Sequence, residues 1–214
     1  MKVLKNMLEE RRATPNEINT DFFDCVLVEL MKDDTILTEE ITLDLMFLLL
    51  FASFETTSLA VIVAIKLLTD NPWALKELTE EHEKILIGRE NPMSGLSWEE
   101  YKSMTFTFQV INETLRLGNV VPALFRKALK DIKFKGYTIP SGWVVIVCPP
   151  AVHLNPASYE DPLDFNPWRW KEMDMKGASL NFMAFGGSLR FCSGADFARL
   201  EIAIFLHCLV TKYR

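Results

Sequence analysis

Residues 185–194 read FGGSLRFCSG and stand directly before an apolar pattern of helical spacing over residues 195–211. The glycines of this loop let the backbone approach a flat ligand closely. Arg190 and the N-terminus of the expected helix both favour a thiolate over a thiol at Cys192. A thiolate in that position can ligate a soft metal or a haem iron. The other interpretation of the loop is a glycine turn around a buried structural cysteine.

Glu113 and Arg116 form an E-x-x-R motif on a predicted helix. A separation of three residues places both side chains on one helix face, where they can pair. Such a pair is common on solvated surfaces and becomes informative only if it is buried and meets a third group. Arg169, in the segment FNPWRW (165–170), is a candidate, because two arginines around one buried glutamate leave fewer unpaired charges than one.

The segment ASFETT (52–57) lies in the middle of the most apolar stretch, residues 45–65. Thr56 and Thr57 can bond back to carbonyls one turn earlier and bend a helix. Glu55 and Thr56 can then relay protons beside a cofactor, and the alternative is a kink with one satisfied acid. The stretch is long enough for a membrane span, but a central acid costs about 2.5–3.5 kcal/mol there, so we expect a buried core helix.

The pattern of the whole chain predicts a mainly α fold with a small antiparallel β-sheet. We expect helices over residues 21–31, 38–69, 73–86, 97–117 and 195–211, and a β-hairpin over 131–147 that turns at Pro140-Ser141-Gly142. Asp21 is a suitable N-cap, and SWEE (97–100) has the form of a capping box. Residues 1–20 are polar and lack the apolar core of a signal peptide.

Composition excludes some classes of function. The chain has 214 residues, 24% of them charged, and a net charge of −6, so we expect no nucleic-acid partner. Its 49% hydrophobic residues suffice for a substantial core. The cysteines at 25, 148, 192 and 208 have neither disulfide-framework nor zinc-site spacing.

Together these motifs resemble the cytochrome P-450 superfamily, the haem-thiolate monooxygenases. The haem loop of that family, F-x-x-G-x-R-x-C-x-G, is matched by Phe185, Arg190, Cys192 and Gly194. Its helix motif [AG]-G-x-[DE]-T-[TS] is matched by Ala52, Glu55, Thr56 and Thr57, and its P-x-R motif by Pro167 and Arg169. Two positions depart, since Ser53 and Ser188 stand where the family usually has glycine, and Ser188 could strain a turn that requires positive φ.

The resemblance implies a role for each matched residue. Cys192 would be the axial ligand of the haem iron, in a loop that includes Phe185, Gly186 and Gly194. Arg190 and Arg126 would bind haem propionates, Glu55 and Thr56 would deliver protons to dioxygen, and residues 120–124 would line the substrate pocket. Glu113, Arg116 and Arg169 would form a structural triad that locks the core on the haem side.

The resemblance also implies an activity: insertion of one oxygen atom of O2 into a hydrophobic substrate, with electrons from an NADPH-dependent reductase. The stretches LLLFASFETTSLA and VCPPAVHLNPASYEDPLDFNPWRW are similar to plant members that oxidise sterols and triterpenoids. The alternative is a truncated, catalytically inactive haem-binding fragment. A haem-thiolate isomerase or dehydratase is disfavoured because Glu55 and Thr56 are present. We expect no obligate protein subunit.

By the same resemblance the chain is the C-terminal, haem-binding half of such a domain. The N-terminal half, with its membrane anchor, and the extreme C-terminus would be absent. The full-length parent would lie on the cytosolic face of the endoplasmic reticulum membrane. Because a half would expose core surface, we expect this chain alone to fold poorly and to hold haem weakly.

Overall fold

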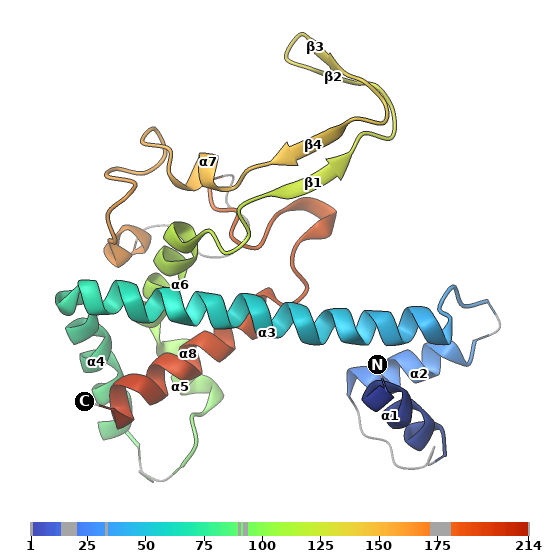
Figure 1. Cartoon of the computed structure of the whole chain (residues 1–214). Helices are drawn as coiled ribbons and strands as arrows, with labels where there is room; N and C mark the ends of the chain where they lie inside the picture. The colour runs from blue at the N-terminus through green and yellow to red at the C-terminus, as the bar shows by residue number, and fades with distance from the viewer. Residues whose placement is uncertain are drawn as a thin grey trace. The chain divides into compact units, whose positions relative to one another are not determined.

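A computed structural model describes residues 2–13, 21–32, 34–89, 91, 94–171 and 181–213, and its elements are drawn in Figure 1. The predicted fold class, mainly α with small antiparallel sheets, is confirmed. The chain divides into two compact units, residues 1–55 and 56–214, and the division falls inside helix α3 (Glu39–Asp70).

The first unit contains helices α1 (Lys2–Ala13) and α2 (Phe22–Leu30) and the N-terminal part of α3. The expected cap of α2 is confirmed, because the Asp21 side chain accepts from the amide of Asp24 at 3.1 Å. Arg11 of α1 pairs with both of these aspartates. The unit has a small apolar core of Leu4, Leu8, Phe23, Leu27 and Leu43. Helix α1 was not predicted, although its two buried leucines are four residues apart, as one helix face requires.

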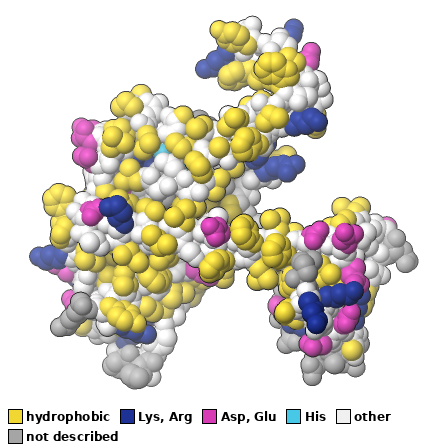
Figure 2. All heavy atoms as spheres, viewed as in Figure 1, with side chains coloured by type: hydrophobic (Ala, Val, Ile, Leu, Met, Phe, Trp, Pro, Cys, Tyr) yellow, Lys and Arg dark blue, Asp and Glu magenta, His cyan; other side chains and the backbone are white. Residues whose placement is uncertain are grey.

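Helix α3 is not the buried core helix that we expected over most of its apolar length. Its first half exposes six large hydrophobic side chains: Ile41, Phe47, Leu48, Leu50, Phe51 and Phe54. Hydrophobic side chains follow the exposed surface of this helix in Figure 2. In the second unit, Ala60, Ala64 and Leu68 are buried at a spacing of four residues. The sequence is apolar all around the helix, whereas the described chain buries Thr42 and Leu43 in the first unit and this stripe in the second.

By length and composition, α3 could also cross a membrane. It is the single helix of this kind within the described residues. The core helix of a soluble protein meets the same criterion of length and composition.

Helices α4 (Pro72–Ile87), α6 (Thr105–Gly118) and α8 (Ala195–Lys212) build the core of the second unit together with the second half of α3, and the short helix α5 (Trp98–Ser103) has no buried residue. Helices α4, α6 and α8 contact one another and bury a shared apolar cluster. The expected capping box at Ser97 and Glu100 is present. The predicted starts and ends of α4 and α8 agree with the structure to within one residue.

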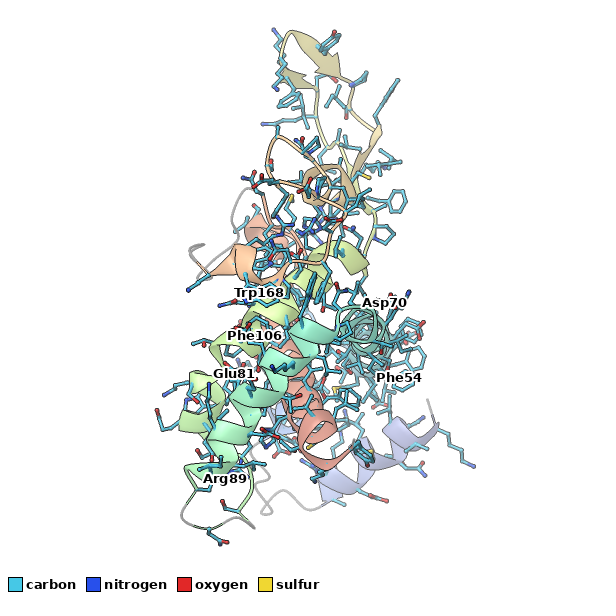
Figure 3. The ribbon with its side chains drawn as sticks, turned by 90° about the vertical axis from the view of Figure 1, so that its left-hand side faces the viewer. Phe54, Asp70, Glu81, Arg89, Phe106 and Trp168 are labelled. Carbon is cyan, nitrogen blue, oxygen red and sulfur yellow. The ribbon has the colours of Figure 1, made fainter. Side chains whose placement is uncertain are left out.

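The single helix expected over 97–117 is in fact two helices, α5 and α6, which meet at Met104. The carboxylate of Glu81, on α4, accepts the amides of Phe106 and Thr107 at 2.7 and 2.9 Å. These amides are unpaired at a helix start, so an acid from another helix caps α6 anew. Figure 3 shows Glu81 beside Phe106.

Two small antiparallel sheets follow α6. Strand β1 (Leu124–Lys127) pairs with β4 (Val144–Val147), and β2 (Ile132–Phe134) pairs with β3 (Tyr137–Ile139). The predicted turn at 140–142 is present, with the amide of Trp143 donating to Pro140 O at 3.3 Å, but it joins β3 to β4, which do not pair with each other. The turn of the β2–β3 hairpin lies at Lys135-Gly136, whose φ values are 48° and 83°. Two central residues with positive φ match the right-handed twist of the strands, as in a type I′ turn.

Candidate functional site

Glu113 and Arg116 lie in the interior of the second unit, and both side chains are fully buried. They pair through two parallel hydrogen bonds, Nε to Oε2 at 2.9 Å and an Nη nitrogen to Oε1 at 2.8 Å. The solvated surface pair that the spacing also allowed is therefore wrong. Two-point pairing of this kind is directional and strong in a dry interior.

Arg116 also donates to three backbone carbonyls. Its other Nη nitrogen reaches the oxygens of His153 and Pro162 at 2.7 and 2.6 Å, and a third contact reaches Asp164 at 3.2 Å. The guanidinium carbon lies 4.9 Å from the ring centre of Tyr159. The buried cation thus has a partner for each of its donors, which buried charge requires.

The Glu113 carboxylate gathers donors from the segment 165–170. Arg169 Nε donates to Oε1 at 2.9 Å, the Asn166 amide to Oε1 at 3.0 Å, and Trp170 Nε1 to Oε2 at 2.8 Å. The structure therefore brings together the three residues of the predicted triad. Sequence reasoning missed Asn166 and Trp170, although both stand in the segment that supplied Arg169.

His153, in α7 (Pro150–His153), is a further buried member of this region that the sequence did not single out. Burial, and secondarily the Arg116 guanidinium, lower the pKa of His153 to about 4. The ring is therefore neutral near pH 7. Its Nδ1 lies 2.8 Å from Asn119 Oδ1, and its Nε2 accepts the amide of Met183 at 2.9 Å.

The loop around Cys192 is folded by its own backbone hydrogen bonds. The amide of Gly186 donates to Met183 O, and the amide of Cys192 donates to Phe185 O, both at 3.0 Å. Gly186 has φ of 77°, which is why glycine suits this turn. Cys192 itself is exposed, so the alternative of a buried structural cysteine is wrong. Its sulfur is accessible to a ligand.

Ser188 begins the short 3₁₀ helix η2 (Ser188–Arg190) and has φ of 61°. This left-handed conformation costs a residue with a Cβ roughly 1 kcal/mol or more relative to glycine. The positive φ expected at this position is present. The strain lies four residues before Cys192.

The other expected site residues are mostly on the surface. Arg190 is exposed in η2, and Arg126 is exposed on β1, where it donates to Phe125 O at 2.9 Å. Gly194 precedes the first residue of α8. Glu55 is the last residue of the first unit and Thr56 opens the second, so their predicted action beside Cys192 stays a prediction.

A cavity of about 600 Å³ lies elsewhere in the second unit, among α4, α5 and α6. Its walls are Glu77, Glu80, Glu81, Lys84, Ile85, Gly88, Glu100, Ser103, Thr105 and Phe106. None of these is one of the expected site residues. Glu77 at its edge accepts from Trp168 Nε1 at 2.9 Å, so part of this acidic lining already serves the packing.

Comparison with known proteins places these features in a family. The family model described as cytochrome P450 matches residues 1–214. The chain is 59% identical over 214 residues to cytochrome P450 87A3 of Oryza sativa subsp. japonica. It is 46% identical over 213 residues to cucurbitadienol 11-hydroxylase of Siraitia grosvenorii and 44% identical over 214 residues to a cholesterol 22-monohydroxylase of Paris polyphylla. Each match covers 100% of this chain but only 42–45% of the relative, so the chain spans less than half the length of these curated relatives.

Proposed function

The chain belongs to the cytochrome P450 family, which binds haem, and from this we propose that it is the haem-binding part of a monooxygenase. The reaction inserts one oxygen atom of O2 into a hydrophobic sterol- or triterpenoid-like substrate. The observation that carries the proposal is the exposed sulfur of Cys192 at the foot of α8, in a glycine-containing turn next to Arg190.

The donor chemistry of the second unit fits a haem. An accessible thiol can bind iron as thiolate, and Cys192 is exposed directly before helix α8. The exposed guanidiniums of Arg190 and Arg126 suit carboxylate groups such as propionates. A haem with a thiolate ligand supplies the activation of O2, because the sulfur donates electron density that favours O–O cleavage.

The remaining residues of the site hold groups in place or carry protons. Glu113, Arg116 and Arg169 fix the segment 165–170 against α6, and this supports their role as the structural triad of the haem side. Glu55 and Thr56 are proposed to hold and pass protons, a task that suits a carboxylate beside a hydroxyl.

The substrate class rests on the relatives. Two of them are named for hydroxylation of cucurbitadienol and of cholesterol, which are a triterpenoid and a sterol. We extend this class to the present chain, together with an NADPH-dependent reductase as electron donor. We also propose location at the endoplasmic reticulum membrane, on its cytosolic face.

The test is the carbon-monoxide difference spectrum of the reduced, haem-loaded chain. We expect the strongly red-shifted Soret band of thiolate ligation, and its loss in Cys192→Ala. Cys148→Ala is the matched control, since Cys148 is also exposed but lies outside the loop. A histidine-type spectrum in the unmodified chain, or a red-shifted band that persists in Cys192→Ala, contradicts the assignment.

The second candidate is a haem-binding fragment without turnover. It is favoured by the exposed apolar surface of α3 and by a span of only 42–45% of the relatives. Turnover of a sterol with reductase and NADPH separates the two candidates. Haem binding without product formation supports the fragment.

A further inference from the structure

His153 connects the buried Glu113–Arg116 network to the cysteine loop, and its side chain is 1% exposed. The Met183 amide can only donate, so the Nε2 that lies 2.9 Å away must be unprotonated. The proton is then on Nδ1, which donates to Asn119 Oδ1 at 2.8 Å. Asn119 Nδ2 points to Leu117 O, which agrees with that orientation of the amide. One neutral tautomer therefore satisfies both contacts.

The ring is held from several sides. Its own backbone oxygen accepts from Arg116 at 2.7 Å, and its plane lies near the ring of Phe182, with centroids 5.6 Å apart. Phe182 in turn packs edge-on against Trp170 at 4.7 Å, and Trp170 donates to Glu113. The position of Nε2 is therefore fixed by groups on α6, α7 and the segment 165–170.

A short series of hydrogen bonds leads from Nε2 to the cysteine. His153 Nε2 accepts the Met183 amide, Met183 O accepts the Gly186 amide, and Phe185 O accepts the Cys192 amide. The last two bonds are both 3.0 Å long. An acceptor on a buried ring that is hydrogen-bonded at both nitrogens thus sets where the turn at Gly186 begins, and that turn sets where Cys192 stands.

We propose that His153 is a positioning residue for Cys192: its unprotonated Nε2 fixes the Met183 amide and thereby the backbone turn that presents the sulfur. The proposal deepens the proposed function and rests on Cys192 being the haem ligand. His153 touches neither the sulfur nor a bound group in this role. Its contribution is a loop that is already in place before the ligand arrives, which reduces the ordering cost of binding.

Two substitutions separate the acceptor from the rest of the ring. In His153→Gln the side-chain amide reaches the position of Nε2 and can present an oxygen to Met183. In His153→Asn the shorter amide reaches only the position of Nδ1, so it can keep the contact to Asn119 but not the one to Met183. Tyr159→Phe is the matched control, because it removes a different hydrogen bond to the same segment, from Tyr159 Oη to Asn181 O at 2.7 Å.

The first readout needs no haem: hydrogen–deuterium exchange of the amides between Met183 and Cys192 in the 214-residue chain. We expect His153→Asn to exchange faster by roughly tenfold, the effect of losing one buried hydrogen bond. His153→Gln and Tyr159→Phe should stay near the rate of the unmodified chain at these amides. The proposal is overturned if the Gln and Asn variants exchange alike, whether both are slow or both are fast.

The second readout is the carbon-monoxide spectrum after haem loading. The red-shifted fraction should fall in His153→Asn and be restored in His153→Gln. If the unmodified chain gives no red-shifted band, the proposed function fails, while the exchange series still decides whether His153 holds the loop. If the band is equal in all variants and exchange is unchanged, His153 has no positioning role although Cys192 remains the ligand.

Discussion

Glu113→Gln is the substitution for which the structure gives the clearest estimate of magnitude. The carboxylate accepts from Arg116 twice and from Asn166, Arg169 and Trp170 once each. A glutamine keeps one oxygen and places an NH2 group at the other position. In the better orientation the NH2 replaces Oε2 and meets the N–H groups of Arg116 Nε and Trp170 Nε1, so two buried donors lose their acceptor.

Each lost acceptor costs about 1–3 kcal/mol, and the two arginines also lose their buried counter-charge. Removing one partner of a buried ion pair costs about 3–5 kcal/mol in total, which agrees with that sum. We expect the free energy of unfolding to fall by this amount in urea titrations followed by circular dichroism. The urea dependence should keep its slope if both states keep their compactness.

Glu99→Gln is the matched control. Glu99 also pairs with a cation three residues away, Lys102, but its side chain is 82% exposed. Surface pairs of this kind contribute about 0–1 kcal/mol, so the control should unfold close to the unmodified chain. A loss below about 1 kcal/mol in Glu113→Gln would refute the reasoning, because the desolvated arginines would then have found other partners.

Three further predictions concern strain, pH and the apolar surface. Ser188→Gly should stabilise the chain by about 1 kcal/mol in thermal melts, because glycine removes the cost of φ at 61°. Gly186→Ala should destabilise it, because alanine would have to adopt φ of 77°. Melting temperatures equal to that of the unmodified chain would contradict both predictions. Burial, and secondarily the charge of His207, lower the pKa of His82 from 6.5 to about 4. As the pH falls, the unfolded state therefore binds the proton before the folded state does. The contribution of His82 to the free energy of unfolding is full above pH 6.5 and declines as the pH falls to 4. This effect makes the free energy of unfolding about 3 kcal/mol lower at pH 4 than at pH 7. In His82→Gln the difference between the two pH values should be smaller by that amount. If the difference is unchanged in the variant, His82 is not its cause. Phe54→Glu should lower both the binding of a hydrophobic dye and the light scattering of the chain, because Phe54 is 71% exposed. For the same reason, the free energy of unfolding should change by less than about 0.5 kcal/mol. A large loss of stability would mean that this side chain is packed.

The sequence by itself determined the features that depend on neighbours along the chain. Asp21 and the capping box at Ser97 start helices with their own side chains, and Pro72 opens α4 because its fixed φ suits a first helical residue. The loop of Cys192 and the helix after it were likewise evident, because glycines and the apolar period are local signals. Residue order also identified the family, which the comparisons establish.

Only the tertiary structure decided what depends on residues far apart in sequence. The break at Met104 follows from Glu81, more than 20 residues earlier, and no local pattern between 97 and 117 records it. The hairpin could turn at Gly136 or at Gly142, both with positive φ, and the pairing of β4 with the distant β1 selects the first. An E-x-x-R pair has the same sequence on a surface as in a core. Asn166, Arg169 and Trp170 give the buried Glu113 its further donors, and the carbonyls of His153, Pro162 and Asp164 accept from Arg116. Burial is a property of the space around a side chain, and sequence spacing specifies only which face of a helix that side chain occupies.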